Sequence, residues 1–453
     1  MGRDILKETG AERAVDILKE KLSGRVDAYE IYVSVGSGLV AEARDGAIDS
    51  LKVRSSAGVG LRTIAGGRPG FGFSSVLTGD ALSAMVDDAA AGSRAASEDK
   101  FLCLPGPQPA ETPCGLLDPA IETISEEEKF KTAILIEESA RGFDKRIQRV
   151  RKASYSESIS SARTVNSSGV DVSHTATFFS GSVMAVAGSN GDSQMGFEIG
   201  MGHGKEDVEA SLVGREAARR AVELLGAGKA ETGKAPVVLE NTVVMDLLGA
   251  LLGSFLADNV IKGKSMLAGK LDKIVASPLL NLWDDGLLPG GWSSSAFDCE
   301  GVPRQKTPLL SQGVCRAFLY DTYWAARKGD ISTGNARRSG FKGMPTIGTS
   351  NVYIEKGEGG ELTELFKKMD KGFFITEFMG VHTIDPVSGD FSLGAAGFKV
   401  EGGVRTNPVR GMAVAGNLME LLKKVEAVGS DLRFIGSVGA PSILVGELDI
   451  SGS

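Results

Sequence analysis

The stretch VSHTATFFSGSVMAVAGSNG, residues 172–191, contains no charged side chain, and its interpretation decides the fold of the first half of the chain. Twenty uncharged residues are long enough to cross a bilayer as a helix. Serine, threonine and glycine are interspersed with the apolar residues throughout, a pattern typical of long strands. The stretch therefore predicts β-structure, and we expect no membrane anchor here.

The segments on either side of residues 172–191 predict the rest of this sheet. Residues 147–200 alternate between apolar and polar side chains, and residues 29–73 form shorter alternations broken by glycines, as antiparallel hairpins do. Helical spacing of apolar residues predicts four helices: residues 11–22, a helix capped by Thr78 or Asp80, a helix from the Ser125/Glu128 capping box to Gly142, and residues 205–225.

A proline-rich strap interrupts this pattern at residues 97–120. It holds five of the 15 prolines, so neither a helix nor a central strand can persist there. The order of elements in the first half is therefore strands, helix, strap, helix, strands and helix. This order predicts an α+β domain with an antiparallel sheet. It lacks the regular alternation of strand and helix that a doubly wound Rossmann fold requires.

The domain boundary is predicted in GAGKAETGKAP, residues 226–236, which has no periodic apolar face. We therefore divide the chain into an α+β domain, residues 1–228, and a second domain, residues 233–453. After one apolar helix at about 242–257, the second domain reads as short strands with two helices, near 360–370 and 417–428. This pattern predicts a β-rich domain of the sandwich or barrel type.

Composition excludes several classes of function. The formal charge is −8 and Lys and Arg form no long run, so direct nucleic-acid binding is not expected. The N-terminal MGRDILKETG lacks the apolar core of a secretory signal, which favours a cytoplasmic protein. The four cysteines form no C-x-x-C motif, and no two of the three histidines have the spacing of a zinc-binding pair.

Two glycine-rich loops of the second domain suggest a binding groove. They are GLLPGGWSSS, residues 286–295, and STGNARRSGFKG, residues 332–343. The guanidinium group of arginine can bind a carboxylate through two parallel hydrogen bonds. A groove lined with aromatic side chains can bind a peptide as an added strand. Five of the nine Trp and Tyr residues lie nearby: Trp283, Trp292, Tyr320, Tyr323 and Trp324. On these residue types alone, the ordinary core and turns of a β-domain are the preferred interpretation.

The second half of the chain also resembles a known family. SPLLNLWDDGLLPGGWSSSAFDCEGVPRQKTPLLSQGVCRAFLYDTYWAARKG (277–329), TGNARR (333–338), SGDFSLGAAGFKVEGG (388–403) and AGNLMELL (415–422) resemble the TldD/PmbA family of modulators of DNA gyrase, and most closely its PmbA (TldE) branch. The resemblance implies a two-domain cytosolic protein that acts on peptides. It also implies that TldD-type members are metallopeptidases, in which a helix carrying H-E-x-x-x-H and a later cysteine bind zinc.

This sequence departs from that zinc motif. The corresponding helix, DLLGALLGSFLAD at residues 246–258, places Leu248, Gly249 and Gly253 at the motif positions, and residues 390–405 contain no cysteine. Leucine and glycine side chains offer no lone pairs to zinc. We therefore expect no catalytic residue, no metal ligand and no cofactor in this chain, and zinc only in a TldD-type partner.

The resemblance thus implies a noncatalytic subunit that pairs with a TldD-type subunit, in a complex that degrades unfolded peptides or trims leader peptides. The resemblance also implies that the TGNARR segment forms part of a peptide-binding groove. The candidate peptide-binding residues are Trp292, Thr333, Gly334, Asn335, Arg337 and Arg338.

Two alternatives stay open at this point. The chain is a stand-alone metallopeptidase if folding brings together an unrecognised ligand set such as Asp298, Glu300 and His382. It is a non-proteolytic peptide-binding regulator if it acts on gyrase or an antitoxin without cleavage. The sequence also leaves a homodimer open beside the heterodimer.

Overall fold

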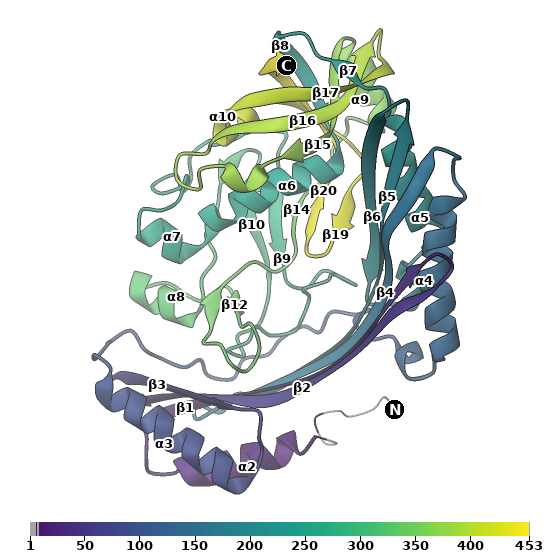
Figure 1. Ribbon diagram of the computed structural model, residues 1–453. Helices are drawn as coiled ribbons and strands as arrows, with labels where there is room; N and C mark the ends of the chain where they lie inside the picture. The colour runs from purple at the N-terminus through teal and green to yellow at the C-terminus, as the bar shows by residue number, and fades with distance from the viewer. Residues whose placement is uncertain (1–5, 7–8, 453) are drawn as a thin grey trace.

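The computed structural model describes residue 6 and residues 9–452, so most of the charged N-terminal stretch lies outside the described residues. The first half of the chain forms a six-stranded antiparallel sheet in the order β3-β2-β1-β4-β5-β6. Figure 1 shows that this long sheet curves around the second half of the chain. The strands are β1 (Ala28–Arg44), β2 (Ala47–Ala65), β3 (Arg68–Ser74), β4 (Ile147–Asn166), β5 (Asp171–Ser189) and β6 (Asp192–Gly202).

The uncharged stretch at residues 172–191 lies almost entirely in β5. This strand pairs along nearly its whole length with β4 on one side, and from Phe179 to Ser189 it also pairs with β6 on the other. Most of its backbone groups are therefore bonded within the sheet. The prediction of long strands is confirmed. In the part of the chain that the structure describes, no helix is long and apolar enough to cross a membrane.

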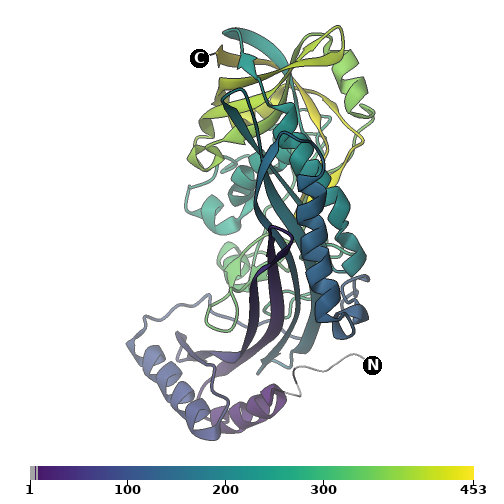
Figure 2. The ribbon, with the colours of Figure 1, turned by 45° about the vertical axis from the view of Figure 1, so that its right-hand side comes forward.

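Four helices cover the outer face of the sheet in two pairs (Figures 1 and 2). The pair α2 (Ala11–Leu22) and α3 (Gly79–Ala95) packs at one end, and the pair α4 (Glu126–Arg141) and α5 (Ala210–Glu223) packs at the other. The Ser125 hydroxyl accepts the N–H of Glu128, which confirms the predicted cap of α4. The predicted helix 205–225 is shorter, because a 3₁₀ turn (Lys205–Asp207) precedes α5.

The strap at residues 97–120 carries no helix or strand before the 3₁₀ turn Pro119–Glu122, as its prolines predict. The strap still contacts the second half of the chain, because the N–H of Gly290 donates to the carbonyl of Cys114.

The second half contains a closed barrel of five strands, in which β8, β15, β16, β17 and β21 pair in turn and β21 returns to β8. The predicted mixed α+β fold with a barrel-like second domain is therefore confirmed. The barrel strands are β8 (Gly233–Leu239), β15 (Gly372–Met379), β16 (Asp390–Glu401), β17 (Val404–Asn417) and β21 (Ile443–Gly452); β7 (Gly228–Lys229) and β18 (Val425–Val428) pair at its edges.

A second sheet packs beside the barrel, in the order β11-β10-β9-β14-β20-β19. Its strands are β9 (Leu282–Asp285), β10 (Lys306–Ser311), β11 (Val314–Cys315), β14 (Val352–Ile354), β19 (Arg433–Ile435) and β20 (Val438–Ala440), and β12 (Ala336–Arg337) pairs separately with β13 (Thr346–Ile347). One apolar core, which includes Leu247, Leu251 and Phe255, joins the barrel and this sheet to α6 (Asn241–Leu252).

Two helix predictions for the second half need correction, and one helix was missed. The apolar helix expected at 242–257 is divided into α6, a 3₁₀ turn (Gly253–Phe255) and α7 (Ala257–Ile261), because Gly253 ends α6. The helix expected at 417–428 ends at Lys423 as α10 (Leu418–Lys423), and residues 425–428 pair with β21 instead. The helix near 360–370 is present as α9 (Leu362–Met369), but α8 (Thr322–Lys328), capped by Asp321, was not predicted.

A buried ion network joins the two halves of the chain. Arg62 of β2 contacts Glu30 of β1 at 2.7 Å and Glu300 of the second half at 2.8 Å. The other carboxylate oxygen of Glu30 pairs with Arg338, and the side chains of both residues are fully buried. Two positive and two negative groups therefore balance one another where the sheet meets the second domain.

Replacing Glu30 tests this joint. The Glu30→Gln variant keeps the size of the side chain but leaves buried guanidinium groups without their shared carboxylate. We expect the free energy of unfolding to fall by about 3–5 kcal/mol, measured by urea unfolding followed by circular dichroism. The control is Glu127→Gln, whose side chain is 76% exposed and pairs only with Lys131 on the helix surface; its effect should stay within about 0.5 kcal/mol. Equal small effects in both variants would contradict a structural role of the network.

Candidate functional site

Helix α6 presents one face to the core and the other to solvent. Leu247, Leu248 and Leu251 are buried, whereas Asp246 and Gly249 are exposed and Gly253 is half-buried. A Cβ atom built on Gly249 meets no other atom within 4 Å, and one built on Gly253 meets only the amide nitrogen of Asn259 at 3.6 Å. The helix therefore offers room on its exposed face, but no metal-binding atom at these positions.

The zinc that the family resemblance implies for TldD-type members does not fit the residues of this chain. Leu248 points into the core, and the two glycines have no side chain. Within residue 6 and residues 9–452, no group of three or more His, Cys, Asp or Glu side chains is arranged to hold a metal ion.

The alternative ligand set of Asp298, Glu300 and His382 does not form such a group either. Asp298 accepts backbone N–H groups, including that of Ala336 at 3.0 Å, and Glu300 is paired with Arg62. His382 lies apart from them in the 3₁₀ turn Val381–Thr383, which packs near α6. Folding therefore assigns the two carboxylates structural partners and does not bring the histidine to them.

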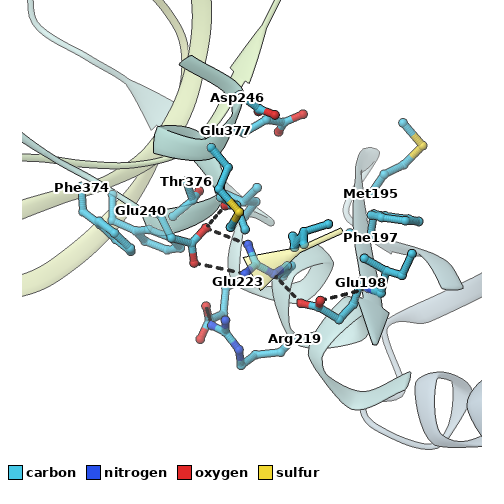
Figure 3. A pocket seen from close by; sticks show the side chains of 18 of the residues that line it. Met195, Phe197, Glu198, Arg219, Glu223, Glu240, Asp246, Phe374, Thr376 and Glu377 are labelled. Carbon is cyan, nitrogen blue, oxygen red and sulfur yellow. Dashed lines mark hydrogen bonds and ion pairs between the residues drawn. The ribbon is translucent and has the colours of Figure 1, made fainter. Parts of the chain in front are cut away.

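A cavity of about 650 Å³ lies next to the exposed face of α6, between the first-half sheet and the barrel. Figure 3 shows Asp246 of α6 and Glu377 of β15 together at one end of it. Partial burial raises the pKa of Asp246, and burial together with the charge of Asp246 raises the pKa of Glu377. This end of the cavity is therefore acidic, and it favours a neutral or cationic group over an anion.

The opposite wall of this cavity is made of ion pairs that join the two halves of the chain (Figure 3). Arg220 of α5 contacts Glu240, the residue before α6, at 2.8 Å and Glu198 of β6 at 3.4 Å. Arg219 pairs with Glu223, which also binds Arg405 of β17 at 3.0 Å. The charges of this wall are thus already paired. Among the described residues that line the cavity there is no histidine, cysteine or serine.

Three of the six predicted peptide-binding residues lie around a second cavity. Trp292, Arg337 and Arg338 line a space of about 330 Å³ between strands β1, β4 and β5 and the loops of the second half. The cavity thus lies at the same junction of the two halves as the first one. Arg338 is also the partner of Glu30, so its charge is already engaged.

The other three predicted residues serve the loop itself. The Thr333 hydroxyl donates to the Tyr320 carbonyl, and the buried Asn335 amide donates to Asp284. Gly334 has a φ of 71° and lies so close to the Pro303 carbonyl that a Cβ atom would be 2.3 Å from the oxygen. These residues hold TGNARR in place, and they do not line either cavity.

The five Trp and Tyr residues that the sequence placed near these loops do not line one groove. Trp283 lies under the Lys306 ammonium at 4.4 Å, Trp292 packs on Phe178 and His203, and Tyr323 packs on Trp324. Two residues that the sequence analysis missed, His174 and Arg304, line the second cavity with Trp292. No local motif marks either of them, because only the docking of the two halves brings them together.

Family models match three consecutive segments of this chain. The model described as PmbA/TldA metallopeptidase domain 1 matches residues 29–93, the central-domain model matches residues 119–225, and the C-terminal-domain model matches residues 232–452. The resemblance found in the sequence is therefore confirmed.

Individual relatives match along nearly the full chain. Metalloprotease PmbA from Escherichia coli O157:H7 is 29% identical over 450 residues, which cover 97% of this chain and 96% of the relative. A crystal structure from Thermotoga maritima, described as a modulator of a DNA gyrase, matches with a TM-score of 0.90 and 28% identity over 97% of this chain and 100% of that one. TldE from Thermococcus kodakarensis has the same fold, with a TM-score of 0.88 and 22% identity over 98% of this chain and 100% of that one.

The open space at Gly249 leads to a prediction about stability. Gly249→Ala should stabilise the protein by about 0.5–1 kcal/mol, because alanine restricts the unfolded chain and favours the helix without a clash. The control is Gly397→Ala in β16, where a Cβ atom would lie 1.9 Å from the Phe374 carbonyl oxygen and should destabilise the barrel. Thermal unfolding of both variants measures the difference. A loss of stability in Gly249→Ala would contradict this prediction and would show that position 249 does not tolerate a Cβ atom.

Proposed function

The chain belongs to the PmbA/TldD metallopeptidase family, and from this premise we propose that it is the noncatalytic subunit of a cytoplasmic metallopeptidase complex. A TldD-type subunit supplies the zinc and the catalytic residues. The present chain completes the chamber that receives the substrate, which is an unfolded peptide or a leader peptide.

One observation carries this proposal. Helix α6 keeps its buried leucine face and its place against the barrel, yet it presents Gly249 and Gly253 where a zinc-binding helix needs ligands. Hydrolysis of a peptide bond at neutral pH requires an activated nucleophile, such as a metal-bound water or a serine or cysteine beside a base. The cavity next to α6 contains none of these among its described lining residues.

The two cavities support the peptide-handling part of the proposal. Both lie where the long curved sheet faces the second domain, and both combine apolar or aromatic walls with charged side chains. Met195 and Phe197 of β6 are 54% and 51% exposed at the first cavity, so apolar surface is available there to an unfolded segment. Extended peptides are bound through such surfaces together with backbone hydrogen bonds.

The proposal is tested by purifying this chain alone, a TldD-type subunit alone and the two together. Zinc content by mass spectrometry and cleavage of an unfolded fluorogenic peptide are measured for each sample. We expect no stoichiometric zinc and no cleavage for this chain alone. We expect both zinc and cleavage for the mixture, with the two chains eluting together in size-exclusion chromatography.

The matched control removes metal from each sample with a chelator. Chelation should abolish cleavage by the mixture, and added zinc should restore it, while the melting temperature of this chain alone stays unchanged because it has no metal to lose. Stoichiometric zinc in the isolated chain, or cleavage by it without a partner, would overturn the proposal. A stable homodimer that does not exchange with the TldD-type subunit would also contradict it.

A further inference from the structure

The second cavity differs from the first in its charge. It is enclosed by residues of β1, β4 and β5 of the curved sheet on one side, and by residues 292–304 and the segment around β12 on the other. Three arginines line it, Arg304, Arg337 and Arg338. Whether it binds an anion depends on how many of these positive charges are already neutralised.

Arg338 and Arg62 are neutralised by Glu30 and Glu300 in the buried network described above. Arg304 and Arg337, in contrast, have no carboxylate within 4.0 Å among the described residues. Arg337 donates one N–H to the Thr349 carbonyl at 3.0 Å, and Arg304 donates its Nε–H to the Phe297 carbonyl at 3.4 Å. Neither contact supplies a negative charge.

Arg304 also has an unused donor, because its Nη1 atom is buried and has no hydrogen-bond partner. A buried donor of this kind is costly unless something binds it. Partial removal from water and the neighbouring Arg304 charge both lower the pKa of Arg337, so the two guanidinium groups lie close enough to repel each other. An anion placed between them would relieve both penalties.

The nearby titratable groups do not fill this role. Asp298 spends its carboxylate on the backbone N–H groups of Glu300, Val302 and Ala336, and burial raises its pKa to about 7. Burial, followed by the charge of Arg304, lowers the pKa of His174 to about 4, so its ring is neutral at pH 7. Asp284 lies near both arginines outside the lining; its charge raises the pKa of Arg337, but burial raises the pKa of Asp284 itself, and it already accepts hydrogen bonds from Asn335 and Ser350. Among the described lining residues, Arg304 and Arg337 thus face the single carboxyl group of Asp298, so the lining keeps a net positive charge.

An aromatic platform lies next to the two arginines. Trp292 packs edge-on against Phe178, with ring centroids 4.8 Å apart, and stacks on His203 at 5.9 Å. His203 is held between the carbonyls of Thr177 and Gly291 at 2.6 and 3.0 Å, so this platform is fixed in place. A ligand that reaches the arginines can place an apolar group on the platform.

We propose that this cavity anchors the C-terminal carboxylate of a bound peptide, with Arg304 and Arg337 holding the two oxygens and Trp292 contacting the last side chain. The inference rests on the proposed function, because it assumes that this subunit handles peptides. A carboxylate matches the planar donor pattern of guanidinium groups, and a cavity of about 330 Å³ holds one or two residues but excludes a folded domain.

The test compares one fluorescent unstructured peptide with a free C-terminus and the same peptide with a C-terminal amide. Binding to the isolated full chain is measured by fluorescence anisotropy. We expect the free acid to bind about 10-fold to 100-fold more tightly, the range given by one or two charge-assisted hydrogen bonds. The Arg304→Met and Arg337→Met double variant should lose this preference.

The control variant is Arg316→Met, which removes an exposed arginine that pairs only with Asp272. It should keep the preference for the free acid. Circular dichroism and thermal unfolding verify that each variant is folded. If the double variant does not fold, the single Arg337→Met variant serves, because Arg337 is exposed at the cavity and its loss should still reduce the preference severalfold.

Several outcomes would overturn the inference. They are equal affinity for the acid and the amide, tight binding of an amidated peptide that ends in aspartate, and competition by inorganic phosphate that is as effective as competition by the free peptide acid. The second would assign the site to side-chain carboxylates, and the third to anions in general. Failure of both peptides to bind would also overturn it, while the zinc and cleavage measurements would still decide the proposed function separately.

Discussion

The buried carboxylate of Glu30 is the contact on which the arrangement of the two halves depends. Glu30 lies near the start of β1, directly opposite Arg62 of β2. Its carboxylate binds Arg62 from the same sheet and Arg338 from the second domain. A buried charge is tolerated only when it is paired, so the loop that carries Arg338 has to dock in one position. Both cavities follow from this docking, because each is bounded by the sheet on one side and the second domain on the other.

Glycine makes this docking possible at close range. Cβ atoms on Gly58 and Gly60 of β2 would lie 2.4 Å from the Phe341 ring and 2.3 Å from the Phe341 carbonyl oxygen, respectively. In the sequence, glycines were interpreted as breaks between hairpins in residues 29–73 and as parts of two loops of a possible binding groove. Part of the glycine content instead serves contacts such as these, in which a strand backbone packs directly against a loop of the other domain.

The elements that could be predicted are those whose signals are local. Periodic apolar residues and caps located α2 and α4 almost to the residue, and alternation located the long strands. Residues 425–428 were assigned to a helix because their pairing with β21 depends on a strand that follows later in the chain. The candidate residues of the second cavity follow the same rule: Trp292 and Arg337 were proposed from the glycine-rich loops and the family resemblance, whereas Arg304 and His174 become neighbours only through docking. Long-range contact, rather than residue type, limits the prediction.

The two faces of α6 are under different physical constraints. The buried face, with Leu247 and Leu251, is part of the core that joins the barrel to the second sheet, so the helix is required for folding in any member with this architecture. The exposed face contributes nothing to that core, and its side chains can be removed without opening a cavity. Glycine at position 249 weakens the helix, by about 1 kcal/mol relative to alanine, and this is small beside the burial that retains it. Packing therefore fixes the position of α6, while function alone decides whether its outer face carries metal ligands.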